Sequence, residues 1–257
     1  MYSLKNNIKK YYDAGIRYDG RQMNETRKLT IKLGVSKNAE GSALVTLGET
    51  MVYAGVKMAL EKPYDDTPDQ GNLMVNAELT PMASPLFESG PPSDFAIEVS
   101  RVVDRTIREG HAVDLKSLCI TSGEKVWSVI IDIVPVNDAG NILDASSIAA
   151  LAALKNTNFP ALKDGKVDYK NKGDKLTLNA EPLLVTIYKI AGKIVADPDY
   201  EEEVAIESRL SIGLLEDGTL CALQKGQAGI LMPEEILDAI ELARKTANDY
   251  RKAYPKK

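Results

Sequence analysis

The sequence has very little of what catalytic and metal sites are often built from. One of its 257 residues is a histidine, His111, and two are cysteines, Cys119 and Cys221. A Ser–His–Asp or Cys–His hydrolase and a Cys/His zinc site are therefore poor interpretations. We expect both cysteines to be reduced core residues, because neither has a second Cys or His at ligand spacing. We expect His111 to cap a helix end rather than act as a catalyst.

Long apolar runs and an excess of positive charge are also missing. No apolar run approaches the roughly 20 residues that span a bilayer, and residues 1–10 lack the apolar stretch of a secretory signal. These absences predict a cytoplasmic protein without membrane contact. The net charge is −5, whereas a general nucleic-acid binder should be basic. Any contact with RNA must therefore come from a local basic patch.

Hydrophobic periodicity predicts many strands interrupted by a few helices, which is typical of an α+β fold. The expected strands are 28–33, 42–47, 51–60, 73–79, 126–136, 183–188, 193–196, 208–215 and 219–223. The expected helices are 3–13, a strongly amphipathic one after Ser93, 145–154, and a last one from Pro233. Ser93 and Asp144 are the expected N-caps of their helices. We predict a single domain over 1–257, with a polar insertion or an internal seam near 156–180.

Three arginines on the helix after Ser93 form the first candidate site. Arg101, Arg105 and Arg108 recur at helical spacing, so their side chains project from one side of the helix. The planar, permanently charged guanidinium group suits phosphate oxygens, and three in a row could hold one RNA strand. The alternative is a solvated face in which Glu98 pairs with Arg101 or Arg105.

A cluster of carboxylates after the strand at 193–196 is the second candidate. Asp197, Asp199 and residues 201–203, all glutamates, could hold Mg²⁺ for phosphoryl transfer. The alternative is an acidic surface loop, since no recognisable phosphate-binding motif lies nearby. The segment 226–229, Gly-Gln-Ala-Gly, is neither a dinucleotide fingerprint nor a P-loop and is expected to be a turn.

Several motifs in order resemble the RNase PH superfamily, and within it the non-catalytic RNase PH-like subunits of archaeal exosomes. They are Arg17-Tyr18-Asp19-Gly20-Arg21 with Glu25 and Arg27, then residues 78–81 (Glu-Leu-Thr-Pro), 87–91 (Phe-Glu-Ser-Gly-Pro), 98–109, 126–133 and 140–145. Their order and spacing fit nearly the whole chain, which makes the resemblance far more specific than any single motif.

The resemblance implies two packed βαβ-like units and a set of partners. These are a catalytic RNase PH-like paralogue that forms a heterodimer with the silent subunit, three such heterodimers in a hexameric ring, RNA-binding cap subunits, and single-stranded RNA. The ring shortens RNA from its 3′ end with inorganic phosphate. The silent subunit helps to shape the partner's active site. By position, Arg101 and Arg105 match the RNA-holding arginines best, followed by Arg108.

The sequence departs from the catalytic relatives at three places. The Gly-Thr-Arg that binds phosphate is replaced by Gly140-Asn141-Ile142, and an apolar Ile142 cannot bind an anion. Of two aspartates six residues apart, the first is Asp197 and the second is replaced by Glu203. A Gly-Pro-Arg turn is replaced around residues 57–59, Lys-Met-Ala. These departures predict no catalytic residues, metal or cofactor in this chain.

Three hypotheses therefore stand. The leading one is a scaffold subunit that turns over nothing alone. The second is an active phosphate-dependent 3′–5′ exoribonuclease that uses Asp197 and Glu203. The third is a general RNA-binding or structural module that forms no ring.

Overall fold

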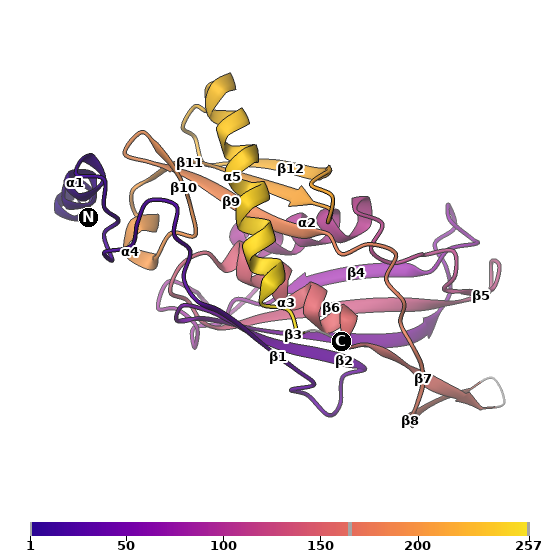
Figure 1. Ribbon diagram of the computed structural model, residues 1–257. Coiled ribbons are helices and arrows are strands. Elements are labelled where there is room, and N and C mark those ends of the chain that lie inside the picture. The colour runs from indigo at the N-terminus through magenta and orange to yellow at the C-terminus, as the bar shows by residue number, and fades with distance from the viewer. Residues whose placement is uncertain (1, 164–165, 256–257) are drawn as a thin grey trace.

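The computed structural model describes residues 2–163 and 166–255, and it confirms the α+β class (Figure 1). The helices are α1 (Tyr2–Asp13), α2 (Asp94–Glu109), α3 (Ile142–Lys155), α4 (Tyr200–Glu203) and α5 (Pro233–Lys252). The strands are β1 (Leu29–Leu33), β2 (Gly41–Leu47), β3 (Thr50–Glu61), β4 (Asn72–Ala77), β5 (Cys119–Thr121), β6 (Lys125–Asn137), β7 (Asn158–Lys163), β8 (Lys166–Lys175), β9 (Leu183–Ile190), β10 (Lys193–Ala196), β11 (Ile206–Leu214) and β12 (Leu220–Gly226). Each helix and strand expected from periodicity is present, with ends that differ by a few residues.

Two sheets carry most of the chain. The larger one has the order β1-β2-β3-β6-β4, with β5 added to β6, and the smaller one has the order β10-β9-β11-β12. In the larger sheet β4 runs parallel to β6, while the other pairings are antiparallel. The nearly continuous apolar strand β6 lies inside the sheet, between β3 and β4, which agrees with burial on both of its faces.

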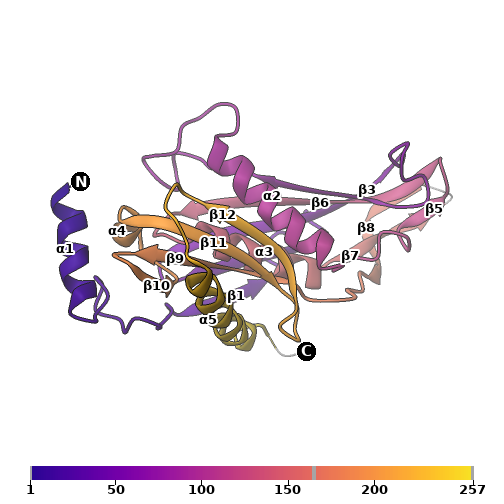
Figure 2. The same cartoon turned by 90° about the horizontal axis from the view of Figure 1, so that it is seen from above.

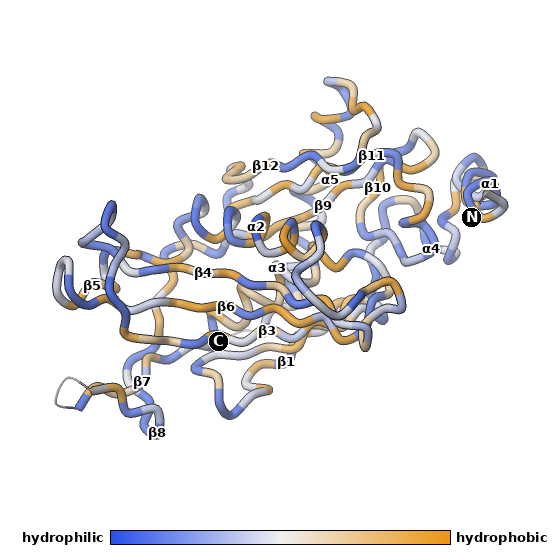
Figure 3. Tube along the Cα trace, turned by 180° about the vertical axis from the view of Figure 1, so that it is seen from behind, coloured by the Kyte–Doolittle hydropathy of each residue, from blue (hydrophilic) through white to orange (hydrophobic). Residues whose placement is uncertain are grey.

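Helix α3 lies between the two sheets and connects their cores (Figures 1 and 2). It contacts β2 and β3 of the larger sheet and β9 of the smaller one. Every residue from Ile142 to Leu154 is buried, and the many alanines let both sheets approach the helix backbone closely. A helix that is apolar all round needs such burial on every side. The two sheets therefore share one continuous hydrophobic core, visible as the apolar colouring along α3 and β6 (Figure 3).

The predicted cap of α3 is wrong. Asp144 lies inside the first turn, and the N-cap is Asn141, whose φ of 57° is in the left-handed region. The preceding Gly140 also has a positive φ, and an added Cβ there would lie 2.6 Å from the backbone of Asp199. Asp144 is instead fully buried and accepts a hydrogen bond from the Thr186 backbone N–H at 2.7 Å. Its carboxylate therefore anchors the helix to β9.

The polar segment near 156–180 contains a hairpin, for which the sequence pattern indicated no strands. Strands β7 and β8 pair antiparallel, but the register shifts twice, between Asn158 and Pro160 and again between Pro160 and Ala161. These irregularities interrupt the two-residue periodicity, which is why the sequence pattern did not indicate strands. The hairpin follows α3 and precedes β9, and it projects beyond the larger sheet (Figure 1).

The N-terminal helix is held on the smaller sheet by a fully buried ion pair. Arg17 Nε donates to Glu202 Oε1 at 2.9 Å, and its Nη1 donates to the Ala196 carbonyl at 2.7 Å. Tyr12 of α1 donates its hydroxyl hydrogen to the same Glu202 at 3.0 Å. Both ionic side chains are completely inaccessible to solvent. Glu202 thereby connects α4 to α1 through Tyr12, and to the segment after α1 through Arg17, which is 185 residues away in sequence.

We expect Arg17→Met to lower the free energy of unfolding by about 3 to 5 kcal/mol, because it leaves the Glu202 carboxylate buried without its cation. The double variant Arg17→Met/Glu202→Leu should recover much of that loss. Urea denaturation of the parent, Arg17→Met, Glu202→Leu and the double variant measures both effects. Lys252→Met is a control, because its pair with Asp249 is exposed and should contribute less than about 1 kcal/mol. Equal losses in the single and double variants would contradict the prediction.

Candidate functional site

The arginine face of α2 lies on a well-defined helix. Ser93 Oγ accepts a hydrogen bond from the Ala96 backbone N–H at 3.2 Å, which confirms the predicted N-cap. The buried side of α2 includes Val99, Val103 and Ile107, and it packs on β4 and towards α3 and β12 (Figure 2). His111 follows the helix with φ 48°, which agrees with a role at the helix end.

The three arginines of this face have different surroundings. All three are exposed. Arg101 has no hydrogen bond or ion pair with the rest of the described chain, whereas Arg105 Nη1 donates to the Gln224 side-chain oxygen at 3.0 Å. Arg108 is engaged, since it pairs with Asp104 at 2.8 Å and donates to the Leu73 carbonyl at 2.9 Å. Arg101 and Arg105 are therefore the members of the face that keep cationic capacity for a ligand.

The expected pairing of Glu98 with Arg101 or Arg105 is wrong. Glu98 makes an ion pair with Arg209 of β11 instead. Glu98 lies on the side of α2 that turns towards the smaller sheet, and the 93%-buried Arg209 needs a counter-charge there. The alternative of an internally neutralised arginine face therefore loses its main support.

Asp197 is buried and surrounded by cations from the N-terminal motif. Arg27 Nη2 lies 2.5 Å from Asp197 Oδ1, and the Arg27 backbone N–H donates to Oδ2 at 2.7 Å. Arg21 Nη1 and Asn141 Nδ2 donate to the same carboxylate at 3.2 and 3.1 Å. Burial raises the pKa of Asp197, but the hydrogen bonds and charge of Arg27, with Arg21, outweigh it and hold the pKa below its ordinary value. Both carboxylate oxygens are thus committed to protein donors.

The other acidic residues of the cluster do not form a surface loop either. Glu202 is buried on Arg17, and Asp199 caps α4 by accepting from the Glu202 backbone N–H at 2.7 Å. Only Glu201 is exposed as the surface-loop alternative expected. Asp19, Asp199 and Glu202 bring carboxylate oxygens within 4.8 Å of one another, but Glu202 is already neutralised. The cluster mainly stabilises the fold, and its buried carboxylates are poorly placed to bind Mg²⁺.

Glu203 lies close to Asp197 through a shared neighbour. The Asn141 backbone N–H donates to Glu203 Oε1 at 2.8 Å, while the Asn141 side chain donates to Asp197. Burial raises the pKa of Glu203 to about 7. Asn141 therefore links the two carboxylates that the resemblance pairs: Asp197 is ion-paired with arginines, whereas burial raises the pKa of Glu203.

A pocket of about 400 Å³ opens beside Glu203, between α2, the start of α3 and the smaller sheet. Its charged lining residues are Asp94, Glu98, Glu203 and Arg209. Arg209 is neutralised by Glu98, which leaves an acidic surplus. Ile142 lines the same pocket and is only 3% exposed, because it packs among apolar residues of α2 and β9. The pocket has no unpaired cation among its described residues and does not suit an anion such as phosphate.

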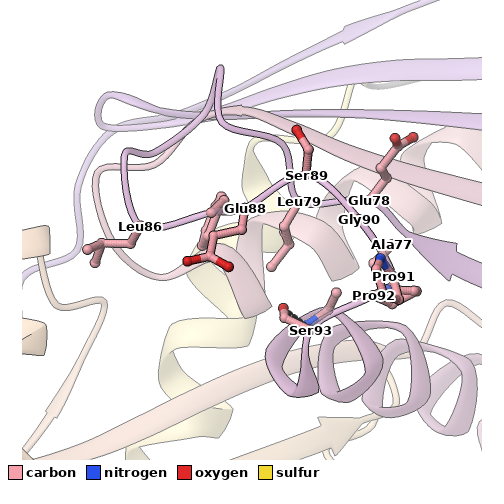
Figure 4. A pocket seen from close by; sticks show the side chains of 12 residues that line it. Ala77, Glu78, Leu79, Leu86, Glu88, Ser89, Gly90, Pro91, Pro92 and Ser93 are labelled. Atoms are coloured by element: carbon pink, nitrogen blue, oxygen red, sulfur yellow. Dashed lines mark hydrogen bonds between the residues drawn. The ribbon is translucent and has the colours of Figure 1, made fainter.

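The loop between β4 and α2 forms a second pocket, of about 370 Å³, next to the start of α2 (Figure 4). Phe87 anchors this loop by packing with Val99 and neighbouring core residues. Figure 4 shows Leu86 and Glu88 on one side of the pocket and Glu78 on the other. Leu86 and Met82 are 72% and 70% exposed. The loop thus presents apolar side chains of the kind that protein partners cover.

The other residues singled out in the sequence are the two cysteines, Lys57 and the segment 226–229. Cys119 and Cys221 are unpaired thiols, as expected, but both are half-buried rather than in the core. Lys57, at the place of the missing Gly-Pro-Arg turn, lies on β3 and pairs with Glu40 at 2.9 Å. Residues 226–229 end β12 in a bend, with Gln227 at φ 64°, which agrees with the predicted turn.

Sequence reasoning missed the connection between the arginines of the N-terminal motif and the carboxylates. The motif stands out only through its resemblance. The carboxylates that pair with its arginines lie 170 or more residues further along the chain. The conspicuous signal available was that Arg17, Arg21 and Arg27 are three cations in a short segment on an acidic protein. That signal indicates a need for counter-charges, but it does not identify them.

Comparison with known proteins identifies the family. Residues 25–160 match "3' exoribonuclease family, domain 1" (RNase_PH), and residues 180–246 match "3' exoribonuclease family, domain 2" (RNase_PH_C). The chain belongs to the 3′ exoribonuclease family of RNase PH. The gap between the two matches, residues 161–179, contains β8 and the end of β7. Among the described residues, none of the helices is long and apolar enough to cross a bilayer.

Individual relatives and solved structures show which members of the family the chain resembles. The Rrp42 exosome complex component of Methanothermobacter thermautotrophicus is 44% identical over 88% of this chain and 85% of its own length. The Methanopyrus kandleri component of the same name is 45% identical, over 93% and 91%. A chain of the Archaeoglobus fulgidus exosome with RNA bound to the active site superposes with a TM-score of 0.92 at 41% identity, covering 98% of each chain. A chain of an archaeal exosome core gives 0.84 at 39%, covering 96% of each.

Glu203 gives a pH-dependent prediction. Its folded-state pKa of about 7 exceeds the ordinary value of 4.5, so ionising it in the folded protein costs stability. That cost is absent below pH 4.5 and grows as the pH rises through 7. Glu203→Gln should therefore be more stable than the parent by about 1 to 3 kcal/mol at pH 8, and nearly equal to it at pH 4.5.

Urea denaturation at the two pH values measures the difference. Glu201→Gln, at an exposed glutamate two residues away on the same helical turn, is the matched control. A Glu203→Gln variant that is equally or less stable at pH 8 would show that the carboxylate is solvated there.

Proposed function

We propose that this chain is the non-catalytic RNase PH-like subunit of an exosome. It pairs with a catalytic RNase PH-like paralogue, and three such heterodimers close a hexameric ring that shortens RNA from its 3′ end with inorganic phosphate in the cytoplasm. RNA-binding cap subunits attach to the ring. Similarity to Rrp42 exosome components over nearly the whole chain supports this assembly.

The observation that carries the non-catalytic role is the pocket beside Glu203. Phosphorolysis needs a site that binds inorganic phosphate next to the phosphodiester, and such sites use unpaired cations or a cluster of N–H donors. By the resemblance, Ile142 replaces the phosphate-binding arginine of the catalytic relatives, and Arg209 is neutralised by Glu98. Asp197 is saturated by Arg27 and Asn141. The carboxylates are present, but their ion pairs and hydrogen bonds stabilise the fold.

The RNA-binding role rests on the arginine face of α2. Arg101 is exposed without a partner among the described residues, and Arg105 has only a neutral one. We propose that these two guanidinium groups hold RNA phosphates on the path to the paralogue's active site. Arg108 is proposed as a weaker contributor, because its charge is already balanced by Asp104.

Two alternatives remain testable. An active exoribonuclease would use Asp197 and Glu203 directly, and Asp197→Ala would then abolish an activity that the chain shows alone. A general RNA-binding module would bind RNA but form no stable hexamer with the paralogue. Size-exclusion chromatography with and without the paralogue separates this second alternative from the scaffold.

The scaffold role predicts that the purified chain alone shows no phosphate-dependent shortening of a single-stranded RNA, while the co-expressed ring degrades it. The double variant Arg101→Glu/Arg105→Glu should assemble normally, because both side chains are exposed. It should retain RNA about tenfold more weakly than the parent ring. Chromatography scores assembly, and filter binding in phosphate-free buffer scores RNA retention.

Lys245→Glu/Lys252→Glu on α5 is the matched control, since it changes the net charge equally at two exposed lysines. Phosphate-dependent shortening by the chain alone would overturn the scaffold role. Equal RNA retention by the arginine and lysine double variants would refute the assigned role of the α2 face.

A further inference from the structure

The β7–β8 hairpin carries a second basic feature that α2 does not account for. Three residues of β8, Tyr169 to Asn171, have no counterpart on β7, because Ala161 pairs with Asp168 and the preceding Pro160 pairs with Lys172. Asp168 holds this bulge by accepting from the Lys170 backbone N–H at 3.0 Å and from the Asn171 side chain at 2.8 Å. The side chain of Asp168 is thus used internally, and the bulge is a defined structure.

The bulge presents an aromatic ring with a cation on it. Tyr169 is 57% exposed, and Lys57 of β3 places its Nζ 5.0 Å from the ring centroid. Lys57 is fixed in turn by Glu40 and by the Asn38 carbonyl. A ring that is supported from one side and mostly open to solvent is a platform on which a flat group can stack.

Exposed lysines follow the ring closely. Lys170, Lys172 and Lys175 are all exposed, and none has a hydrogen bond or ion pair from its side chain within the described residues. Strand β8 carries four lysines against two aspartates, on a protein whose net charge is −5. One of those aspartates, Asp168, is already bound within the bulge.

We propose that Tyr169 and the exposed lysines of β8 form a contact for single-stranded RNA, separate from the α2 arginine face. An exposed aromatic ring that accepts a base, next to cations that follow the backbone, is the combination that single-stranded nucleic-acid sites use. The inference takes its ligand class, single-stranded RNA, from the proposed function. Its geometry depends on the hairpin and on Lys57 of the adjacent β3.

RNA is favoured over a protein partner by the composition of this surface. Protein interfaces are depleted in lysine and rely on apolar anchors at their centre, whereas three exposed lysines lie within six residues here. The charge complements a phosphodiester backbone, and an open ring face suits a base of any identity. The contact should therefore be salt-sensitive and tolerant of sequence.

The test uses the ring assembled with the catalytic paralogue, in phosphate-free buffer, and an oligouridine as the probe. Tyr169→Ala should weaken binding about fivefold or more, while Tyr169→Phe, which keeps the ring, should stay near the parent. Lys170→Gln/Lys172→Gln should make the dependence of log affinity on log salt shallower by about 1.4, because each single-strand phosphate contact contributes about 0.7. Lys9→Gln/Lys245→Gln, at two exposed helix lysines, should leave the slope unchanged.

Photo-crosslinking of a 4-thiouridine RNA should also mark the peptide that contains Tyr169. Unchanged affinity and salt slope in both hairpin variants would overturn the inference, and so would loss of subunit assembly with unchanged RNA affinity, which would indicate a protein-docking surface. If the parent chain forms no ring with the paralogue, the proposed function fails by itself. The RNA affinity and salt slope of the same variants are then compared in the isolated chain, which tests the hairpin contact independently of the ring.

Discussion

The ion pair between Arg27 and Asp197 is the interaction on which the candidate site depends. Arg27 also donates to the carbonyls of Ala139 and Gly140, at 2.6 and 3.1 Å. One guanidinium group therefore fixes the N-terminal segment, the turn before α3 and the end of β10 at a single point. Because a buried carboxylate without its cation is strongly unfavourable, these segments must come together for the protein to fold. The first turn of α3 and the pocket beside it take their positions from this point.

This use of charge explains how a chain rich in carboxylates can have a pocket beside Glu203 that does not suit phosphate. The first Asp of the expected catalytic pair is a counter-ion, and its pKa is held low by arginines from the same chain. Glu203 has no such cation, so burial raises its pKa. The two residues are neighbours through Asn141, yet the pKa of one is lowered by its cations and the pKa of the other is raised by burial to about 7. A metal ion or a phosphate would have to break existing protein contacts to be accommodated there.

The elements and their order could be predicted from periodicity, because amphipathic patterns such as the buried stripe of α2 are local properties. The cap of α3 could not, since it combines a left-handed Asn141 with a Gly140 that closely approaches the backbone of Asp199, far away in the sequence. The β7–β8 hairpin was missed because its bulges break the alternation. The partners of Arg27 and Glu98 lie 170 and 111 residues away, and no local pattern contains that information. The choice of Arg101 and Arg105 came from resemblance, and the structure adds which cations remain unpaired.

The cations that remain unpaired after folding are the ones that can bind the proposed ligand. Four arginines already form ion pairs within the fold: Arg17, Arg21, Arg27 and Arg209. These pairs connect segments that lie far apart in the sequence. What the protein can offer to an anionic polymer is therefore the positive charge left at the surface, and α2 and β8 each concentrate some of it. A body of net charge −5 offers RNA no general attraction over its whole surface. Discrete basic contacts on an acidic surface constrain where an RNA strand can lie, which suits a subunit that guides a substrate towards a partner's active site better than one that coats RNA.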